Sequence, residues 1–240
     1  MTATQPADRE MIEAILPVLE RIAASLAMEP TGGDPNATRF ALRADANVEG
    51  LKLADPALRR AVGSRGAFTF RGTLQPDGVV DVAAFDLDAP TATLSYAGRV
   101  GQNTLTGTLK AGLADLSAFS DVADRTLAGS VAVKANLSGD PARKAVTADV
   151  DATTQGLVLG LPALDRLLGR EPHFSGRLSQ VFDGYSFDGV KLDGAEMVAR
   201  LEGKATARLA DAKLLVDVKT LSALDSRLAG RALLDGRLSG

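Results

Sequence analysis

The sequence predicts a mostly β protein, built as an elongated antiparallel sheet with a few short helices. Apolar residues alternate with polar ones along much of the chain, which places them on one face of each strand. Turn signals such as Asp77-Gly78 and Asp183-Gly184 separate the alternating runs. Hydrophobic residues make up 45% of the 240 residues, but 8 Phe, 2 Tyr and no Trp supply few large anchors for one thick core. Such a composition suits many short strands.

The chain also repeats itself at a spacing of about 105 residues. Gly33-Asp34-Pro35 returns as Gly139-Asp140-Pro141, and Pro56-Ala57-Leu58 returns as Pro162-Ala163-Leu164. We therefore predict three parts, namely residues 1–31, a first copy at 32–138 and a second copy at 139–240. Because Gly240 aligns with Gly139, we expect a third copy to follow, in a longer repeat protein.

Residues 1–31 differ from the repeat. Ile12, Ile15, Leu19 and Leu26 follow a period of 3.6, which predicts an amphipathic helix. We favour a helix that caps the open end of the sheet over one that binds a membrane surface, because its charges are mixed and a surface binder should be basic.

Six strands are expected in each copy. In the first copy they lie near residues 38–48, 66–75, 78–88, 91–100, 103–113 and 129–138. Two helical turns should interrupt them. The first covers Asp55 to Val62, or Leu161 to Leu168 in the second copy, with Pro in the first turn and Gly just past the end. The second covers roughly Leu113 to Ala123.

The alternation of apolar and polar residues predicts which side chains lie on each face of the sheet. Polar positions such as Lys134, Arg200, Glu202 and Lys204 should point outward. The opposite face should carry Met197, Ala199, Leu201, Val131, Val133 and Leu137.

Composition and motifs argue against several classes of function. The net charge is −3 with both signs interspersed, so the basic patch that nucleic acid requires is not expected. The chain contains no Cys, which excludes thiol catalysis and Cys zinc sites. It also lacks a run of 18 apolar residues and a secretory signal pattern. His173 is the one histidine, and we expect a surface or packing role for it. We predict no enzyme activity, cofactor or metal.

The apolar face leaves two solutions open. The sheet either curls into a sandwich and fills itself, or bends into a trough whose lining contacts an apolar ligand. A lining of Ala, Val, Leu and Gly is smooth and holds no polar group that would orient a ligand, which suits acyl chains.

Three segments carry a resemblance to a known family: Leu51 to Leu58, Leu137-Ser138-Gly139-Asp140-Pro141 and Leu228-Ala229-Gly230. They resemble the degenerate repeats of the TamB proteins, which belong to the AsmA-like group of bridge-like lipid transfer proteins. The resemblance covers about residues 33–240. It implies a twisted sheet curled into a hydrophobic groove, in a protein anchored in the inner membrane that crosses the periplasm.

The resemblance further implies a function and partners. The family is proposed to pass phospholipid to the outer membrane and to support assembly of outer-membrane proteins and autotransporters, with an outer-membrane barrel of the TamA/BamA type as partner. The anchor and the part that docks the barrel are not recognised in these residues. The alternatives are a ligand-free structural spacer or adhesin-like scaffold, and an enzyme that carries the repeats.

The residues predicted to face lipid are apolar strand residues from both copies. They are Phe70, Leu74, Leu94, Tyr96, Leu105, Leu109, Val131, Val133, Leu137, Phe174, Leu178, Met197, Ala199, Leu201, Val216, Val218, Leu234 and Leu238.

Overall fold

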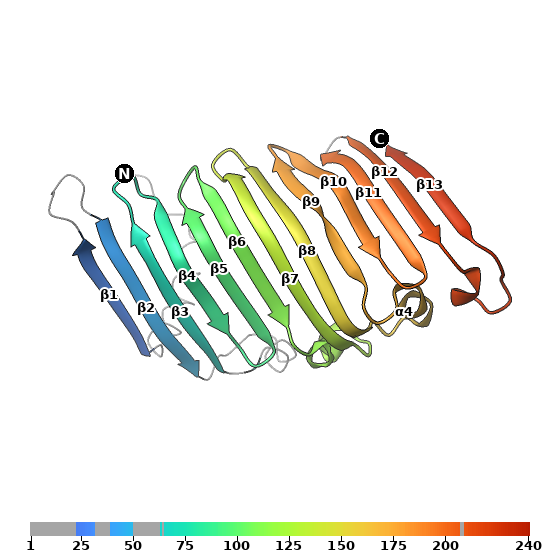
Figure 1. The fold of residues 1–240 in the computed structure, drawn as a ribbon, viewed down its shortest axis with the longest axis horizontal. Coiled ribbons are helices and arrows are strands. Elements are labelled where there is room, and N and C mark those ends of the chain that lie inside the picture. Colours follow the sequence, from blue (N-terminus) through green and yellow to red (C-terminus); the bar gives the residue numbers. More distant parts are fainter. Residues whose placement is uncertain (1–22, 32–38, 50–62, 64, 207–208) are drawn as a thin grey trace, which may run out of the picture.

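The computed structural model describes residues 23–31, 39–49, 63, 65–206 and 209–240. Its strands form one antiparallel sheet in which every strand pairs with its neighbours in the chain, so strand order equals sequence order (Figure 1). The strands are β1 (Ala23–Thr31), β2 (Arg39–Glu49), β3 (Arg65–Leu74), β4 (Val80–Asp88), β5 (Ala92–Val100), β6 (Leu105–Leu113), β7 (Ala128–Asp140), β8 (Ala145–Val158), β9 (His173–Val181), β10 (Gly184–Asp193), β11 (Met197–Thr206), β12 (Ala210–Val218) and β13 (Ala232–Ser239). The predicted class, a mostly β chain with an antiparallel sheet and short helices, is confirmed.

The helical elements are short and lie at one end of the strands. They are η1 (Leu116–Phe119), α3 (Ser120–Ala123), α4 (Pro162–Leu168) and η2 (Leu221–Ala223). The helix predicted from Leu161 to Leu168 is confirmed as α4, with Pro162 in its first turn and Gly169 after its end. The turn predicted from Leu113 to Ala123 begins three residues later, because Leu113 still pairs with Val131. The helix predicted from Asp55 to Val62 lies outside the described residues.

The predicted N-terminal helix needs a correction. Residues 23–31, its last part, form β1, which pairs with β2 from Ala23 opposite Asn47 to Thr31 opposite Arg39. Residues 1–22 lie outside the described residues. Pairing with β2 satisfies backbone N–H and C=O groups that would otherwise be unpaired along the edge of the sheet. This stabilisation outweighs the preference for a helix that the 3.6-residue spacing of the apolar residues indicates. The sheet therefore starts before the predicted boundary at residue 31.

One predicted hairpin turn is confirmed, and the other is displaced by one residue. At Asp77-Gly78, the Gly78 N–H donates to the Gln75 carbonyl at 3.0 Å, and the Asp77 carboxylate accepts from the Val79 N–H at 3.1 Å. In the β9–β10 hairpin, Val181 pairs with Gly184, so the loop is Phe182-Asp183 and Gly184 already belongs to the strand.

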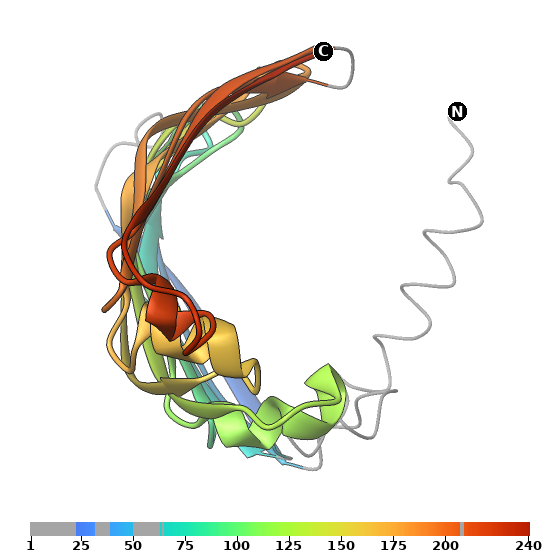
Figure 2. The ribbon, with the colours of Figure 1, turned by 90° about the vertical axis from the view of Figure 1, so that its right-hand side faces the viewer.

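The sheet curls along the direction of its strands, so that the end-on view is an arc with the helices on its inner side (Figure 2). The described strands do not form a second sheet stacked on the first. The self-filled sandwich is therefore not the arrangement of the described residues.

The core sits where the helices meet the sheet. Leu167 and Leu168 of α4 and Ala223 of η2 pack with Leu157, and with two strand residues opposite each other, Met197 and Val218. The Arg166 guanidinium ties α4 to η2, because its Nε donates to the Ala223 carbonyl at 2.6 Å and one Nη to the Leu224 carbonyl at 3.0 Å. The inner side of the arc is therefore the apolar side.

Candidate functional site

The apolar face of the sheet is the most extended feature of the described residues. Residues directly opposite each other in an antiparallel ladder point to the same face, so the strand pairings trace rows of side chains across the sheet. The first row contains Ala46, Phe68, Leu87, Leu94, Ala111, Val133, Ala152, Phe174, Leu192, Ala199, Val216 and Leu234. It crosses from β2 to β13 without a polar side chain.

Two further rows run beside it. The second contains Ala44, Phe70, Phe85, Tyr96, Leu109, Ala135, Val150 and Gly176, and continues after a bulge with Val190, Leu201, Leu214 and Gly236. The third contains Leu42, Gly72, Val82, Gly98, Gly107, Leu137, Ala148, Leu178, Phe187, Gly203, Ala212 and Leu238. None of the three rows carries a charge.

The other predicted lining residues share this face. Leu74 and Leu105 lie beyond the third row, and Val131, Met197 and Val218 lie beyond the first, toward the helices. The predicted residues therefore occupy one surface, which we call the apolar face. Their contact with lipid stays a prediction.

Two bulges keep the apolar rows continuous, and sequence reasoning missed them. In β4 the pairing with β5 shifts between Val82 and Phe85, and in β10 the pairing with β11 shifts between Phe187 and Val190. A bulge adds one residue to one strand, which would otherwise turn every later side chain to the wrong face. The signal was in the sequence, because apolar alternation breaks at Ala83-Ala84 and again at Asp188-Gly189.

Tyr96 is the polar side chain within the three rows. Its hydroxyl donates to the Thr106 carbonyl at 3.0 Å, which satisfies the group without a charge, and burial raises the pKa of the phenol. The ring lies over two glycines opposite each other, Gly98 and Gly107, where an added Cβ would meet the Tyr96 side chain at 2.8 and 2.9 Å. The tyrosine thus fills space that the missing side chains leave.

Coverage of the apolar face is uneven. The helix-side end, around Met197 and Val218, is buried under α4 and η2. Leu201, two rows further along β11, is only half-buried, and Leu234 and Leu238 at the last strand expose 57% and 58% of their surface. In the second and third rows Val82, Ala135, Val190 and Ala212 are buried, while larger side chains such as Leu109 and Leu201 remain in partial contact with solvent.

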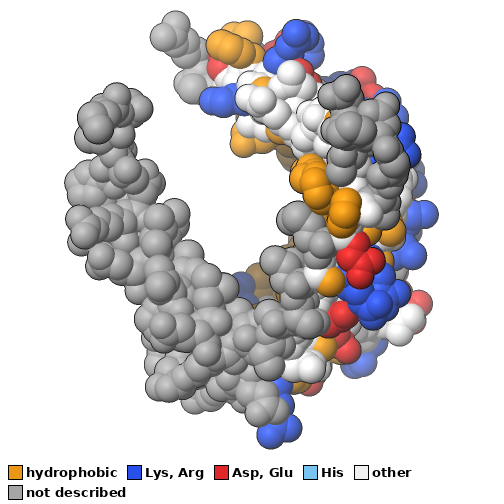
Figure 3. Space-filling view, turned by 90° about the vertical axis from the view of Figure 1, so that its left-hand side faces the viewer, with side chains coloured by type: hydrophobic (Ala, Val, Ile, Leu, Met, Phe, Trp, Pro, Cys, Tyr) orange, Lys and Arg blue, Asp and Glu red, His pale blue; other side chains and the backbone are white. Residues whose placement is uncertain are grey.

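The convex face is polar, with charged side chains along the outer side of the arc (Figure 3). It carries ion pairs between neighbouring strands. Arg177 donates to Asp149 at 2.7 Å, and Arg237 donates to Asp211 at 2.9 Å. Hydrogen bonds from these guanidiniums lower the pKa of Asp211 and raise the pKa of Arg177 and of Arg237. Arg200, Glu202, Lys204 and Lys134 lie on this face, as their alternation with the apolar rows requires.

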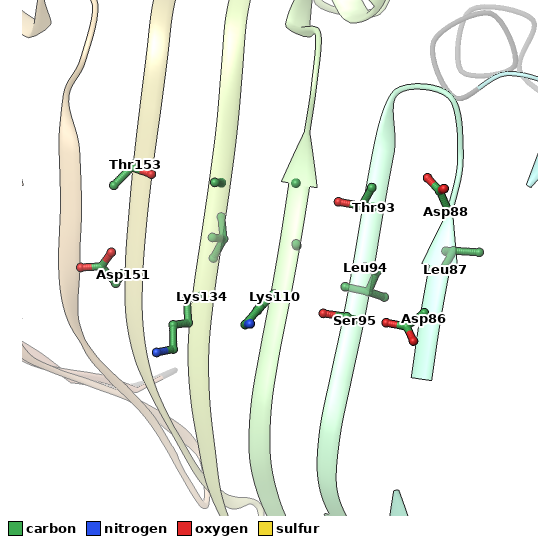
Figure 4. A pocket seen from close by; sticks show the side chains of 14 residues that line it. Asp86, Leu87, Asp88, Thr93, Leu94, Ser95, Lys110, Lys134, Asp151 and Thr153 are labelled. Carbon is green, nitrogen blue, oxygen red and sulfur yellow. The ribbon is translucent and has the colours of Figure 1, made fainter. Parts of the chain in front are cut away.

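A shallow hollow on the convex face is the alternative candidate site (Figure 4). It exists because Gly112 and Ala132 place no large side chain between the charged positions. Lys110 lies opposite Lys134 on the next strand, and Lys134 lies opposite Asp151. This mixed-charge surface is open to water, so its charges are screened and offer weak selectivity.

His173 lies on the same convex face. Its Nε2 is 2.8 Å from the Asp151 carboxylate, and both side chains are exposed. In the part of the chain that the structure describes, no three His, Asp or Glu residues cluster to hold a metal ion. A surface hydrogen bond to Asp151 is the role that this geometry gives to the histidine.

Comparisons with protein-family models, with curated proteins and with solved structures find no match for this chain. None of the described helices is long and apolar enough to cross a membrane.

Proposed function

We propose that the concave apolar face is a groove that binds the acyl chains of phospholipid and lets them move along the sheet. The observation that carries this proposal is the set of charge-free rows across the sheet, left partly exposed in the middle. Partly exposed apolar surface of this extent marks a binding surface more often than a structural one. A lipid tail needs only nonpolar contact, which such a surface supplies.

The absence of charge from the three rows suits transport better than tight binding. A site that fixes one ligand uses a few placed polar groups to orient it. Tyr96, the polar side chain within these rows, has its hydroxyl engaged with Thr106. Acyl chains would therefore bind loosely and without a preferred position, and could pass from strand to strand.

We further propose that the sheet consists of two copies of one unit, at residues 32–138 and 139–240. Backbone conformation supports this at aligned glycines, because φ is +99° at Gly129 and +96° at Gly230, a region that disfavours other residues. The bulges in β4 and β10 also fall at aligned positions, opposite Gly98 and Gly203. Repetition would let a groove extend without a change in its lining.

The biological setting is proposed from the resemblance to TamB repeats. This chain would be a segment of a periplasmic protein anchored in the inner membrane, and it would conduct phospholipid toward the outer membrane. In that setting the longer protein would support the assembly of outer-membrane proteins and autotransporters beside a TamA/BamA-type barrel, through parts other than these residues. Binding and transport, not catalysis, would be its work.

Site-specific crosslinking tests the groove. A photoreactive residue placed at Leu201 points to the apolar face, and one at Arg200 points to the convex face of the same strand. The protein is incubated with vesicles of phosphatidylethanolamine and phosphatidylglycerol, illuminated and analysed by mass spectrometry. We expect lipid adducts at 201 and few at 200. Leu109 and Lys110 on β6 form a second matched pair.

Equal labelling at both positions of each pair would contradict the groove, because it would report unspecific membrane contact. An absence of adducts at 201 and 109, in a protein whose circular dichroism is native, would favour the ligand-free spacer. That second function has one observation in its favour, since α4 and η2 already cover part of the same face.

A further inference from the structure

Phe182 is the most exposed large hydrophobic side chain of the described residues, with 83% of its surface open to solvent. It lies at the tip of the β9–β10 hairpin, where Val181 pairs with Gly184 and leaves Phe182 and Asp183 as the loop. A side chain so exposed contributes little to the core. Exposed apolar side chains that gather at one place mark an interaction site.

The backbone at Phe182 adds to this anomaly. Its φ is +33°, in the left-handed region that bulky residues rarely adopt. In a two-residue hairpin loop, a positive φ at the first position is normally supplied by glycine. The chain thus keeps an aromatic residue where glycine would be more stable, and the exposed ring gains no burial that would offset the strain. Such strain is characteristic of functional positions.

Two further exposed side chains lie beside Phe182. Leu209, at the start of β12, exposes 60% of its surface, and Tyr185 exposes 58%. Tyr185 pairs with Ala205 and Ala205 with Ala210, so the β9–β10 and β11–β12 hairpins adjoin. Their tips lie at the end of the sheet opposite the helices (Figure 1). We call Phe182, Tyr185 and Leu209 the tip cluster.

The tip cluster is continuous with the apolar face. Tyr185 lies on the same strand as Phe187 of the third row, two positions away and without a bulge between them. Because side chains alternate along a strand, both point to the apolar face. The apolar face therefore extends to the open end of β10 and ends there in exposed aromatic side chains.

Charges of both signs flank the tip cluster. Asp183 follows Phe182 directly and is exposed, and Lys144 is exposed at the tip of the neighbouring β7–β8 hairpin. Arg143 on that tip pairs with Asp140 at 3.4 Å. Neither sign dominates among these residues, so a partner held mainly by charge is not favoured. The apolar side chains are what distinguish this place on the surface.

We propose that the tip cluster inserts into the surface of a phospholipid bilayer and docks this end of the sheet on a membrane. Phe182 and Leu209 would enter the acyl region. Tyr185, further along its strand, would lie at the level of the head groups, where an aromatic ring with a hydroxyl is favoured. A protein partner would need a pocket for the protruding ring, whereas a bilayer accepts it without one. This contact would hold whether or not the apolar face binds lipid.

A tryptophan placed at the tip tests the insertion. The chain contains no Trp, so Phe182→Trp supplies a single fluorescent reporter. With vesicles of phosphatidylcholine, its emission should shift to shorter wavelength, and brominated acyl chains in the vesicles should quench it. Val122→Trp is the matched control, because Val122 exposes 44% of its surface on α3, at the opposite end of the strands. Its emission should not change with vesicles.

Phe182→Gly separates binding from folding. It removes the ring and places at a positive φ the residue that tolerates it, so the melting temperature should not fall. Cosedimentation with the same vesicles should show a partition coefficient at least ~10-fold lower, since burial of a phenylalanine side chain contributes at least that factor. Val122→Ser should bind vesicles as the parent does.

Several results would overturn the proposal. One is a tryptophan at position 182 whose emission neither shifts nor is quenched, and another is a Phe182→Gly protein that binds vesicles as well as the parent. Binding that requires phosphatidylglycerol and disappears in salt would indicate attachment by charge instead of insertion. An emission shift that follows protein concentration without vesicles would identify a second copy of the chain as the occupant.

The tip and the groove can fail separately. Lipid adducts at position 201 without quenching at position 182 would support the groove and reject the tip. Quenching at 182 without adducts at 201 would support the tip and reject the groove.

Discussion

The helix-side end of the apolar face and its middle are built from the same residue types on the same strands. On β11, Met197 is buried under α4 and η2, while Leu201 is half-buried and open to the inner side of the arc. The difference arises from the connections, because α4 and η2 fold back over one end only. A period of two in the sequence therefore decides which face a residue is on, and the connecting segments decide whether that face is covered.

The largest expected difference between the two regions concerns a buried charge. Leu168→Arg places a charge in the core between α4 and the sheet, where we expect a loss of about 3–5 kcal/mol in the free energy of unfolding. Leu201→Arg places it where water can reach, and should cost about 1 kcal/mol or less. Equilibrium unfolding in urea measures both.

A second pair of variants, with less disruptive substitutions at the same two positions, serves if the Leu168→Arg protein does not fold. Leu168→Ala should cost about 2–5 kcal/mol, and Leu201→Ala clearly less. Equal losses of unfolding free energy at the two positions would mean that the middle of the face is buried as well. The distinction between a covered end and an open middle would then be wrong.

The second prediction concerns what stabilises the open middle in place of side-chain burial. There the backbones of β5 and β6 are packed closely, because a Cβ at Gly98 would overlap the Thr106 carbonyl oxygen. Gly98→Ala should therefore destabilise the protein by about 1–3 kcal/mol. Gly66→Ala is the control, since its Cβ would meet only the Asp88 carbonyl at 3.4 Å. If thermal melting is the same for both variants, close strand packing is not important there.

The smallest expected effect comes from the convex side of the same strands. A hydrogen bond from Arg231 lowers the pKa of Asp217 below its ordinary value of 3.8, and one from Arg237 does the same for Asp211. Because the folded-state pKa is depressed, the stability that these pairs contribute is present above pH 3.8 and is lost as the pH falls through the folded value.

Melting temperatures measured between pH 5 and 2.5 check this. Asp217→Asn should melt slightly lower than the parent at pH 5 and converge with it in acid. Added salt should reduce the difference, since both partners are near the surface. A gap that persists at the lowest pH would show that the carboxylate charge is not its source.

Sequence alone located most strands to within two residues, because alternation is required wherever one face of a sheet is apolar and the other is solvated. The same rule placed Met197 and Leu201 on one face with no knowledge of their partners. It failed at β1, where Ala23 and Leu26 fit a helical period and only pairing with β2 determines a strand. It also could not distinguish the covered end of the face from the open middle, since that depends on where α4 and η2 fold.

The order of the sheet has a consequence for how the chain is made and taken apart. Each strand pairs only with the strands before and after it in the sequence, so pairing requires no closure of a long loop. Folding can therefore proceed hairpin by hairpin from whichever end is available first. Contacts between neighbouring strands give the sheet a low contact order, which accompanies fast folding. For the same reason, a force that pulls the two ends apart meets one strand pair at a time. Mechanical resistance should therefore stay nearly constant as strands peel away, without a single large break.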